Sequence, residues 1–175
     1  MNILETGKKK MAVLLQVFTA ITVICGSHSN AQTPPDLVFT PVITSGLSTK
    51  SLDIVSAADG SNRLFIVGLE GTVRMWTGTG TSTSIFMDIS GDSIPTPQPG
   101  SERGLLSLAF HPDYNGTTNR YFFIWYCINT VPQNIPCIRL TRFETMIGDP
   151  NLADESTGTV LLTIEQPEGD HCGGK

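Results

Sequence analysis

Charged residues are scarce in this chain, and their scarcity excludes several classes of protein. Only 15% of the 175 residues are charged, which is too few for a helical bundle or a coiled coil. Hydrophobic residues make up 39%, which is too many for a disordered chain. Lysine and arginine number 11 against 16 acidic residues, so the chain lacks the basic stripe with which a general nucleic-acid binder neutralises phosphate.

Several catalytic motifs are absent as well. The sequence has no Gly-x-Ser-x-Gly elbow, no Cys-x-x-Cys pair, no phosphate-binding loop and no His-Glu-x-x-His. Turn-forming residues are abundant instead, with 17 glycines and 11 prolines. Threonine, serine, valine and isoleucine dominate the middle of the chain, which predicts an all-β protein of many short strands joined by turns.

The first residues have the pattern of a secretory signal peptide. The basic stretch Lys8–Lys10 precedes the apolar run Met11–Cys25, and small residues lead up to Ala31, after which we expect cleavage. The alternative is an uncleaved membrane anchor, but the run is shorter than the roughly 20 residues that span a bilayer. We therefore expect residues 1–31 to be removed and the protein to be secreted or periplasmic, with no membrane span remaining.

The mature part contains the same strand pattern twice. Asn62-Arg63 and Asn119-Arg120 each open an apolar, aromatic-rich strand. An alternating strand precedes each pair, and two further strands follow it. These six strands are expected at Leu52–Val55, 72–76 and 85–89 in the first copy, and at Leu105–Phe110, 138–143 and 160–164 in the second. A repeated four-stranded antiparallel unit predicts β-propeller blades; the alternative is a β-sandwich whose hairpins look alike.

Two blades do not complete a propeller, because each blade buries its faces only between neighbours and closure takes at least four. We expect residues 32–46 to be an extended lead-in and residues 47–175 to be the N-terminal part of a longer propeller. The innermost strands are expected to be Leu52–Val55 and Leu105–Phe110. The far face of the second blade would then expose apolar residues, drawn from Phe122, Ile124, Leu140 and Leu162.

The blade pattern brings two loops to one rim of the propeller. One loop ends near Gly104 and the other begins after Glu165, and between them they carry Glu102, Arg103, Asp170 and His171. Titratable groups that converge at a concave rim indicate a functional site. His171 is the best general base in the chain, with Asp170 beside it to orient the imidazole; the alternative is a surface loop histidine. His111, at a strand end, is expected to cap a turn.

The cysteines left after cleavage allow one cross-strand pair. Cys127 and Cys137 lie in adjacent apolar segments separated by a loop, so they are a disulfide candidate in an oxidising compartment. The alternative is a pair of buried thiols that pack as small hydrophobes. Cys172, beside His171, is left unpaired.

Two polar segments are interpreted as ordinary loops. Asp149, Asp154 and Glu155 are expected in a solvated loop, because their spacing fits no EF-hand. Asn115-Gly116-Thr117 is a glycosylation sequon, but it is first of all a good turn and matters as a sequon only in a eukaryotic secretory pathway.

Three segments together resemble a known family. Residues 100–114, which read GSERGLLSLAFHPDY, resemble a segment of the soluble aldose sugar dehydrogenases, the glucose/sorbosone dehydrogenase family. Asn62–Val67 with Gly71–Arg74 is similar to that family's first blade, and Asp170–Gly174 resembles its (N/D)H-x-GG motif. The resemblance implies a six-bladed β-propeller that uses pyrroloquinoline quinone, with a Ca²⁺ ion whose ligands are expected beyond residue 175.

The resemblance also implies roles for individual residues. His171 matches the catalytic base, which takes the C1 hydroxyl proton of an aldose while hydride passes to the quinone; an external acceptor then removes the electrons. Asp170 and Glu102 match substrate-binding positions. Cys172 departs from the family, which has asparagine or glutamine there, and the quinone ligands are unknown. Two alternatives are a non-enzymatic extracellular binding propeller, like that of the hedgehog-interacting proteins, and a calcium-dependent, lactonase-like hydrolase.

Overall fold

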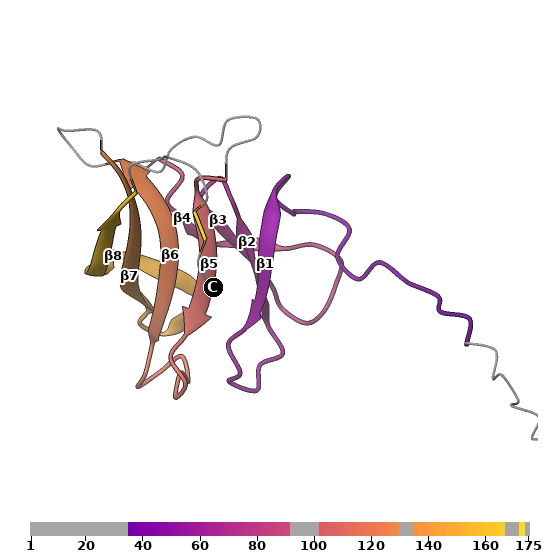
Figure 1. Cartoon of the computed structure of the whole chain (residues 1–175). Coiled ribbons are helices and arrows are strands. Elements are labelled where there is room, and N and C mark those ends of the chain that lie inside the picture. Colours follow the sequence, from indigo (N-terminus) through magenta and orange to yellow (C-terminus); the bar gives the residue numbers. More distant parts are fainter. Residues whose placement is uncertain (1–34, 92–101, 130–134, 167–171, 174–175) are drawn as a thin grey trace, which may run out of the picture. The chain divides into compact units, whose positions relative to one another are not determined.

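The computed structural model describes residues 35–91, 102–129, 135–166 and 172–173. The chain divides into two units, residues 1–39 and residues 40–175. In the first unit, the described residues 35–39 are exposed and form no strand. The described residues of the second unit form eight strands and no helix (Figure 1). No described segment of the chain is a helix of the length and hydropathy that a membrane crossing needs.

The eight strands form two antiparallel sheets of four strands each. The first sheet contains β1 (Ser51–Ser56), β2 (Leu64–Gly68), β3 (Thr72–Trp76) and β4 (Ser84–Asp88). The second contains β5 (Leu105–Phe110), β6 (Tyr121–Asn129), β7 (Pro136–Met146) and β8 (Asp149–Glu165). Strand order follows chain order in both sheets.

The two sheets stack as neighbouring blades. β1 contacts β5 and β4 contacts β8, so strands that match in the repeat lie against each other (Figure 1). Stacked meanders with matched strands are the arrangement of adjacent propeller blades, whereas a sandwich of the immunoglobulin kind uses Greek-key connections. The predicted all-β fold with two four-stranded blades is confirmed.

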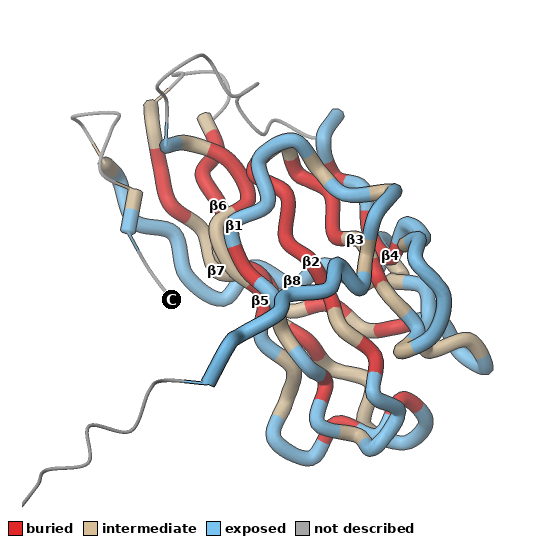
Figure 2. Tube along the Cα trace, turned by 90° about the vertical axis from the view of Figure 1, so that its right-hand side faces the viewer, coloured by how far each residue is buried: buried red, intermediate tan, exposed pale blue. Residues whose placement is uncertain are grey.

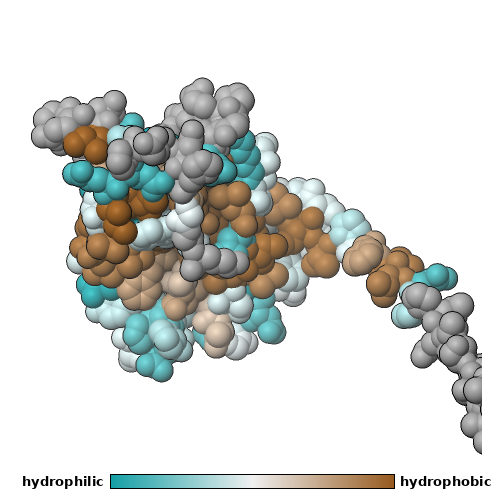
Figure 3. Space-filling model, viewed as in Figure 1, coloured by the Kyte–Doolittle hydropathy of each residue, from teal (hydrophilic) through white to brown (hydrophobic). Residues whose placement is uncertain are grey.

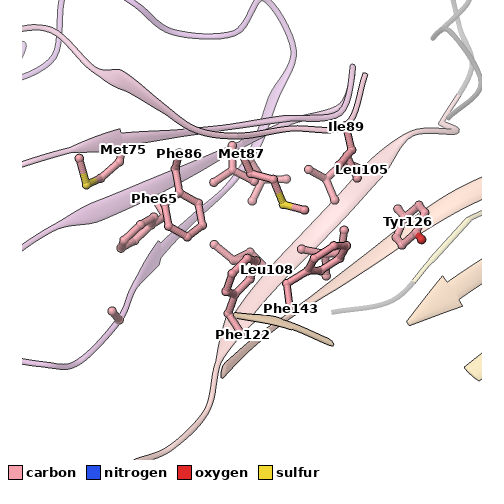
Figure 4. Close-up of a cluster of buried hydrophobic side chains, with 14 of the residues drawn as sticks. Phe65, Met75, Phe86, Met87, Ile89, Leu105, Leu108, Phe122, Tyr126 and Phe143 are labelled. Atoms are coloured by element: carbon pink, nitrogen blue, oxygen red, sulfur yellow. The ribbon is translucent and has the colours of Figure 1, made fainter. Parts of the chain in front are cut away.

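The core of the unit lies between the blades. Figure 4 shows side chains of both sheets pointing toward one another, with aromatic rings at the centre. The Phe65 and Phe86 rings meet edge to face at 4.8 Å, and Phe86 lies 5.2 Å from Phe122 of the other sheet. Aromatic pairs at such separations add about 0.5–1.5 kcal/mol beyond the area that they bury. Burial is concentrated in the two middle strands of each sheet, β2 and β3 in the first and β6 and β7 in the second, while β8 is largely exposed (Figure 2).

The prediction of which apolar residues the second blade exposes on its far face is partly wrong. Phe122 and Ile124 are completely buried, because both point from β6 into the core between the blades. Leu140 pairs with Trp125, one residue out of phase with Phe122 and Ile124, and therefore lies on the opposite face of the sheet. On this outer face Leu162 is 46% exposed, as expected. Hydrophobic residues are visible at the surface over both sheets in Figure 3.

The predicted disulfide is absent. Cys127 and Cys137 are both buried free thiols. In the register of β6 and β7, Cys137 pairs with Ile128 rather than with Cys127. The two cysteines therefore project from opposite faces of the sheet, and the alternative of two thiols packed as small hydrophobes describes them correctly.

The last strand is far longer than predicted. β8 contains 17 residues and includes Asp149, Asp154 and Glu155, which the sequence had assigned to a loop. Its pairing with β7 is interrupted by several register shifts. At one of them Asp154 Oδ1 accepts hydrogen bonds from the backbone N–H and the hydroxyl of Ser156. Such local turns explain why the segment lacks the alternation that marks a regular strand.

An arginine in the repeated Asn-Arg pair connects the two blades. Arg63 is only 6% exposed and forms an ion pair with Asp59. Its Nη1 also donates to the Pro150 carbonyl oxygen and, at 3.0 Å, to Asn151 Oδ1 of the second blade. Burial raises the pKa of the Asp59 carboxyl, but hydrogen bonds from Ser61 and Arg63 outweigh this and leave that pKa below its ordinary value.

The repeat supplies a matched test of this connection. Arg120, the counterpart of Arg63, instead binds Glu144 and the Thr145 carbonyl oxygen of its own blade. We expect Arg63→Ala to lower the free energy of unfolding by about 3 kcal/mol, because the nearly buried Asp59 carboxylate loses its cationic partner and the bonds to the second blade are lost as well. Arg120→Ala should cost only about 1 kcal/mol, because that pair is more exposed and bridges no blades. Urea titration of both variants measures the difference, and equal losses would contradict an inter-blade role for Arg63.

Candidate functional site

The candidate site lies at one end of the second sheet. Leu105 at the start of β5 pairs with Tyr126 near the end of β6, and Cys137 at the start of β7 pairs with Glu165 at the end of β8. The described residues that precede β5 and follow β8 therefore share one rim. This is the rim on which the repeat predicted the two inter-blade loops to converge.

Gly104 fixes the point where the chain enters the second blade. Its carbonyl oxygen accepts from the Cys127 N–H at 2.8 Å, and the next residue, Leu105, donates to the Leu69 carbonyl oxygen at 3.0 Å. The first bond belongs to the second blade, and the second bond reaches the first blade. A Cβ atom on Gly104, whose φ is +156°, would lie 1.9 Å from the Leu69 oxygen. Only glycine fits this close approach of two backbones.

The two charged residues before Gly104 have different environments. Arg103 Nη2 donates to the Ile128 carbonyl oxygen at 3.0 Å and to Asn129 Oδ1 at 2.6 Å. These bonds tie the loop to the end of β6, so Arg103 holds the scaffold in place. Glu102 is exposed on the rim, where its carboxylate is accessible from solvent.

The predicted base and its neighbour, His171 and Asp170, lie outside the described residues, and their roles stay predictions. The chain immediately beyond them is described: the Gly173 carbonyl oxygen accepts a hydrogen bond from Trp125 Nε1 at 2.9 Å. Cys172 is partly exposed. This bond holds Gly173 against β6, the second strand of its own blade, as the Leu105 N–H bonds to Leu69 at the end of β2, the second strand of the first blade.

The histidine assigned to a structural role does have one. His111 Nδ1 accepts from the Asp113 N–H at 3.1 Å and lies 2.9 Å from Asn119 Nδ2. The imidazole thereby closes the turn between β5 and β6, at the end of the sheet opposite the rim. The prediction of a turn cap is confirmed.

The sequence did not reveal a polar pocket between the blades. A cavity of about 190 Å³ is lined by residues of four strands or their ends, among them Ile89, Tyr126, Thr141 and Glu155. The Tyr126 and Thr141 hydroxyls lie 3.1 Å apart, and Glu155 Oε1 accepts from the Asp88 N–H at 2.8 Å. Hydrogen bonds from Ser90 hold the pKa of the Asp88 carboxyl below its ordinary value. No sequence signal joins these residues, because the stacking of the blades brings Asp88 and Ile89 of the first blade against Tyr126, Thr141 and Glu155 of the second.

A second cavity, of about 430 Å³, lies on the outer face of the first blade and is almost wholly apolar. Its lining comes from β1 to β3 and from the segment before β1, and it includes Val42, Leu47, Ile54, Ile66 and Trp76. Ile54 is 64% exposed there. An exposed apolar hollow on a blade marks a surface that has room for a further partner.

The quinone and calcium implied by the resemblance have no assembled site in the described part of the chain. Of the residues predicted to bind substrate or to act as base, only Glu102 is described, and the calcium ligands were expected beyond residue 175. The described residues contain no group of three His, Cys, Asp or Glu side chains arranged to hold a metal ion. Both cofactors therefore stay predictions.

The fold and the rim define an all-β protein built of propeller blades. Its sequence is similar to those of known proteins. The chain is 31% identical over 138 residues to the Hedgehog-interacting protein of Mus musculus and 30% identical over 138 residues to that of Homo sapiens. Each match includes 76% of this chain but only 19% of the relative, so the chain spans about a fifth of the length of the curated relatives it matches. No family model matches.

These relatives overturn the predicted enzyme. Both are named for interaction with a protein, hedgehog, and neither name describes an oxidoreductase. The prediction of a sugar dehydrogenase dependent on pyrroloquinoline quinone is therefore wrong. The similarity fits the alternative stated from the sequence, a binding propeller whose partner is a protein.

Proposed function

We propose that this chain supplies two blades of an exported, non-enzymatic propeller that binds a signalling protein of the hedgehog kind. The observation that carries the proposal is the 31% identity, over 138 residues, to a protein named for that interaction. The match includes 76% of the chain, so the similarity is not that of a short motif.

The architecture of the rim supports a binding role. Loops that recognise partners are effective when a rigid scaffold positions them. Here the Gly104 carbonyl oxygen bonds to Cys127 of the second blade, and the next residue, Leu105, bonds to Leu69 of the first. Arg103 bonds to the end of β6. Glu102 stands exposed beside these anchors. A fixed acidic group on a rim is suited to a partner that presents basic residues, because rim charges guide encounter and orientation.

The outer faces of both blades support membership of a larger propeller. Ile54 on the first blade and Leu162 on the second are each about half exposed or more, although Phe65 and Phe122, on the faces between the blades, are fully buried. Blades in propellers have a neighbour on both faces. We accordingly propose that residues 47–175 are part of a longer propeller, preceded by the lead-in 32–46, and that the leader 1–31 directs export.

Binding can be measured directly with the exported chain. We expect a purified hedgehog signalling domain, passed over the immobilised chain, to bind in a salt-dependent manner. Glu102→Lys should slow association by about threefold to tenfold at low salt, because it reverses a rim charge. Asp113→Lys is the matched control: Asp113 is equally acidic and 88% exposed on its side chain, but lies at the opposite end of the sheet. It should leave association unchanged.

Two results would overturn this function. If the folded chain bound no hedgehog domain at micromolar concentration, the proposed partner would be wrong. Oxidation of an aldose by the same chain, with added quinone and Ca²⁺ and a reducible dye, would restore the enzyme that the relatives exclude. Equal effects of the two charge reversals would show binding through another surface.

A further inference from the structure

The turn between β5 and β6 contains the one Asn-x-Ser/Thr sequence in the chain, Asn115-Gly116-Thr117. From the sequence it had been interpreted chiefly as a turn. Asn115 and Thr117 are exposed, whereas Gly116 between them is buried with φ +70°. A Cβ atom on Gly116 would lie 2.8 Å from Pro150 Cβ. The backbone of the turn is therefore fixed against the protein while the two side chains of the sequon face solvent.

The oxygen and the nitrogen of the Asn115 side-chain amide make different hydrogen bonds. Oδ1 accepts from the backbone N–H groups of Thr117, Thr118 and Asn119 at 2.9–3.0 Å, and from the Thr117 hydroxyl at 3.0 Å. These bonds hold the turn. Nδ2 donates one hydrogen bond, to Thr118 Oγ1 at 2.9 Å. An amide nitrogen carries two hydrogens, so one N–H remains for substitution without loss of any bond that shapes the turn.

We propose that Asn115 is an N-glycosylation site of the exported protein. In the transfer, a bond forms between Asn115 Nδ2 and the anomeric carbon of an oligosaccharide carried on a lipid pyrophosphate. The bond between that carbon and the pyrophosphate oxygen breaks, the lipid pyrophosphate leaves with the electron pair, and the Nδ2 proton passes to a base of the transferase. The glycosylated amide keeps its oxygen acceptor and its remaining N–H, so the folded turn accommodates the sugar.

The position of the turn makes the modification compatible with binding. Asn115 lies in the connection from the end of β5 to the start of β6, whereas Glu102 precedes the start of β5. These are opposite ends of the same sheet. A glycan on Asn115 therefore extends away from the candidate rim. The inference rests on the export part of the proposed function and not on the identity of the partner.

The experiment uses the whole chain expressed in eukaryotic cells, with medium and cell lysate collected separately. We expect the chain in the medium to lose mass on treatment with a peptide-N-glycosidase. In ¹⁸O water that treatment should leave labelled aspartate at position 115, which excludes deamidation before the treatment, and a parallel incubation without enzyme should leave no label and so excludes deamidation during it. Thr117→Ser keeps the sequon and should stay glycosylated, whereas Thr117→Val removes the hydroxyl and should abolish the mass shift.

The outcomes separate this inference from the proposed function. Unmodified chain in the medium would overturn glycosylation alone and leave export intact. Unmodified chain confined to the lysate would overturn export, and glycosylation with it. A glycan that persists in Thr117→Val would also contradict the assignment, because the sugar would then lie elsewhere.

Discussion

Replacement of Gly104 by alanine is expected to lower the free energy of unfolding by more than about 3 kcal/mol, because the new methyl group collides with backbone. The Cβ would lie 1.9 Å from the Leu69 carbonyl oxygen, which itself accepts the hydrogen bond from the Leu105 N–H. Relief of the clash requires the start of β5 to move away from the first blade. The substitution thus breaks the backbone connection between the blades as well as straining Gly104.

The measurement is equilibrium urea unfolding followed by tryptophan fluorescence. Gly91→Ala is the matched control, since Gly91 has nothing within 4 Å of the position of a Cβ atom. It should change stability by less than about 0.5 kcal/mol. If Gly104→Ala were as stable as Gly91→Ala, the close approach of Gly104 to Leu69 would be wrong, and with it the rim built on it.

Phe122→Ala is expected to cost about 4 kcal/mol, the usual range for a large aromatic removed from a core. The Phe122 ring is 0% exposed and stacks on Phe143 at 5.8 Å. It also lies 5.2 Å from Phe86 of the first blade, so its loss opens a cavity at the contact between the blades. Besides reduced stability, we expect increased binding of a hydrophobic dye, because the blades separate more readily.

The neighbouring residue provides the control. Phe123 belongs to the same strand but points to the outer face and is only partly buried. Phe123→Ala should therefore cost clearly less than Phe122→Ala under the same conditions. Similar losses for both would mean that β6 does not present its even-numbered residues to the first blade, and that the two sheets are not stacked blades.

Much of the fold was predictable because the signals that carry it are local. Alternation marks the strands, and the repeated Asn-Arg pair marks equivalent positions in two blades. His111 was assigned to a turn from its neighbours alone, and the turn forms as expected. The exception is β8, where register shifts and turns around Asp154 destroy the alternation on which the prediction depends.

Function was less accessible from the sequence than fold. The segment at 100–114 resembled a dehydrogenase family, yet within it Gly104 and Arg103 serve to position the chain against Leu69 and Ile128. Residues that maintain a blade junction are expected in any propeller of this build, whatever it binds. The resemblance therefore reflects the shared propeller fold, and the enzymatic activity inferred from it was wrong.

By itself the sequence determined the strands, their order and their grouping into two blades, because hydrogen-bonded neighbours in a meander are also neighbours along the chain. Only the tertiary structure decided which face of each strand meets the other blade, because a shift of one residue in register exchanges the two faces. That choice buried Phe122 and Ile124, separated Cys127 from Cys137, and brought Arg63 to Pro150 at the start of β8. These contacts join residues remote in sequence, and no local pattern encodes them.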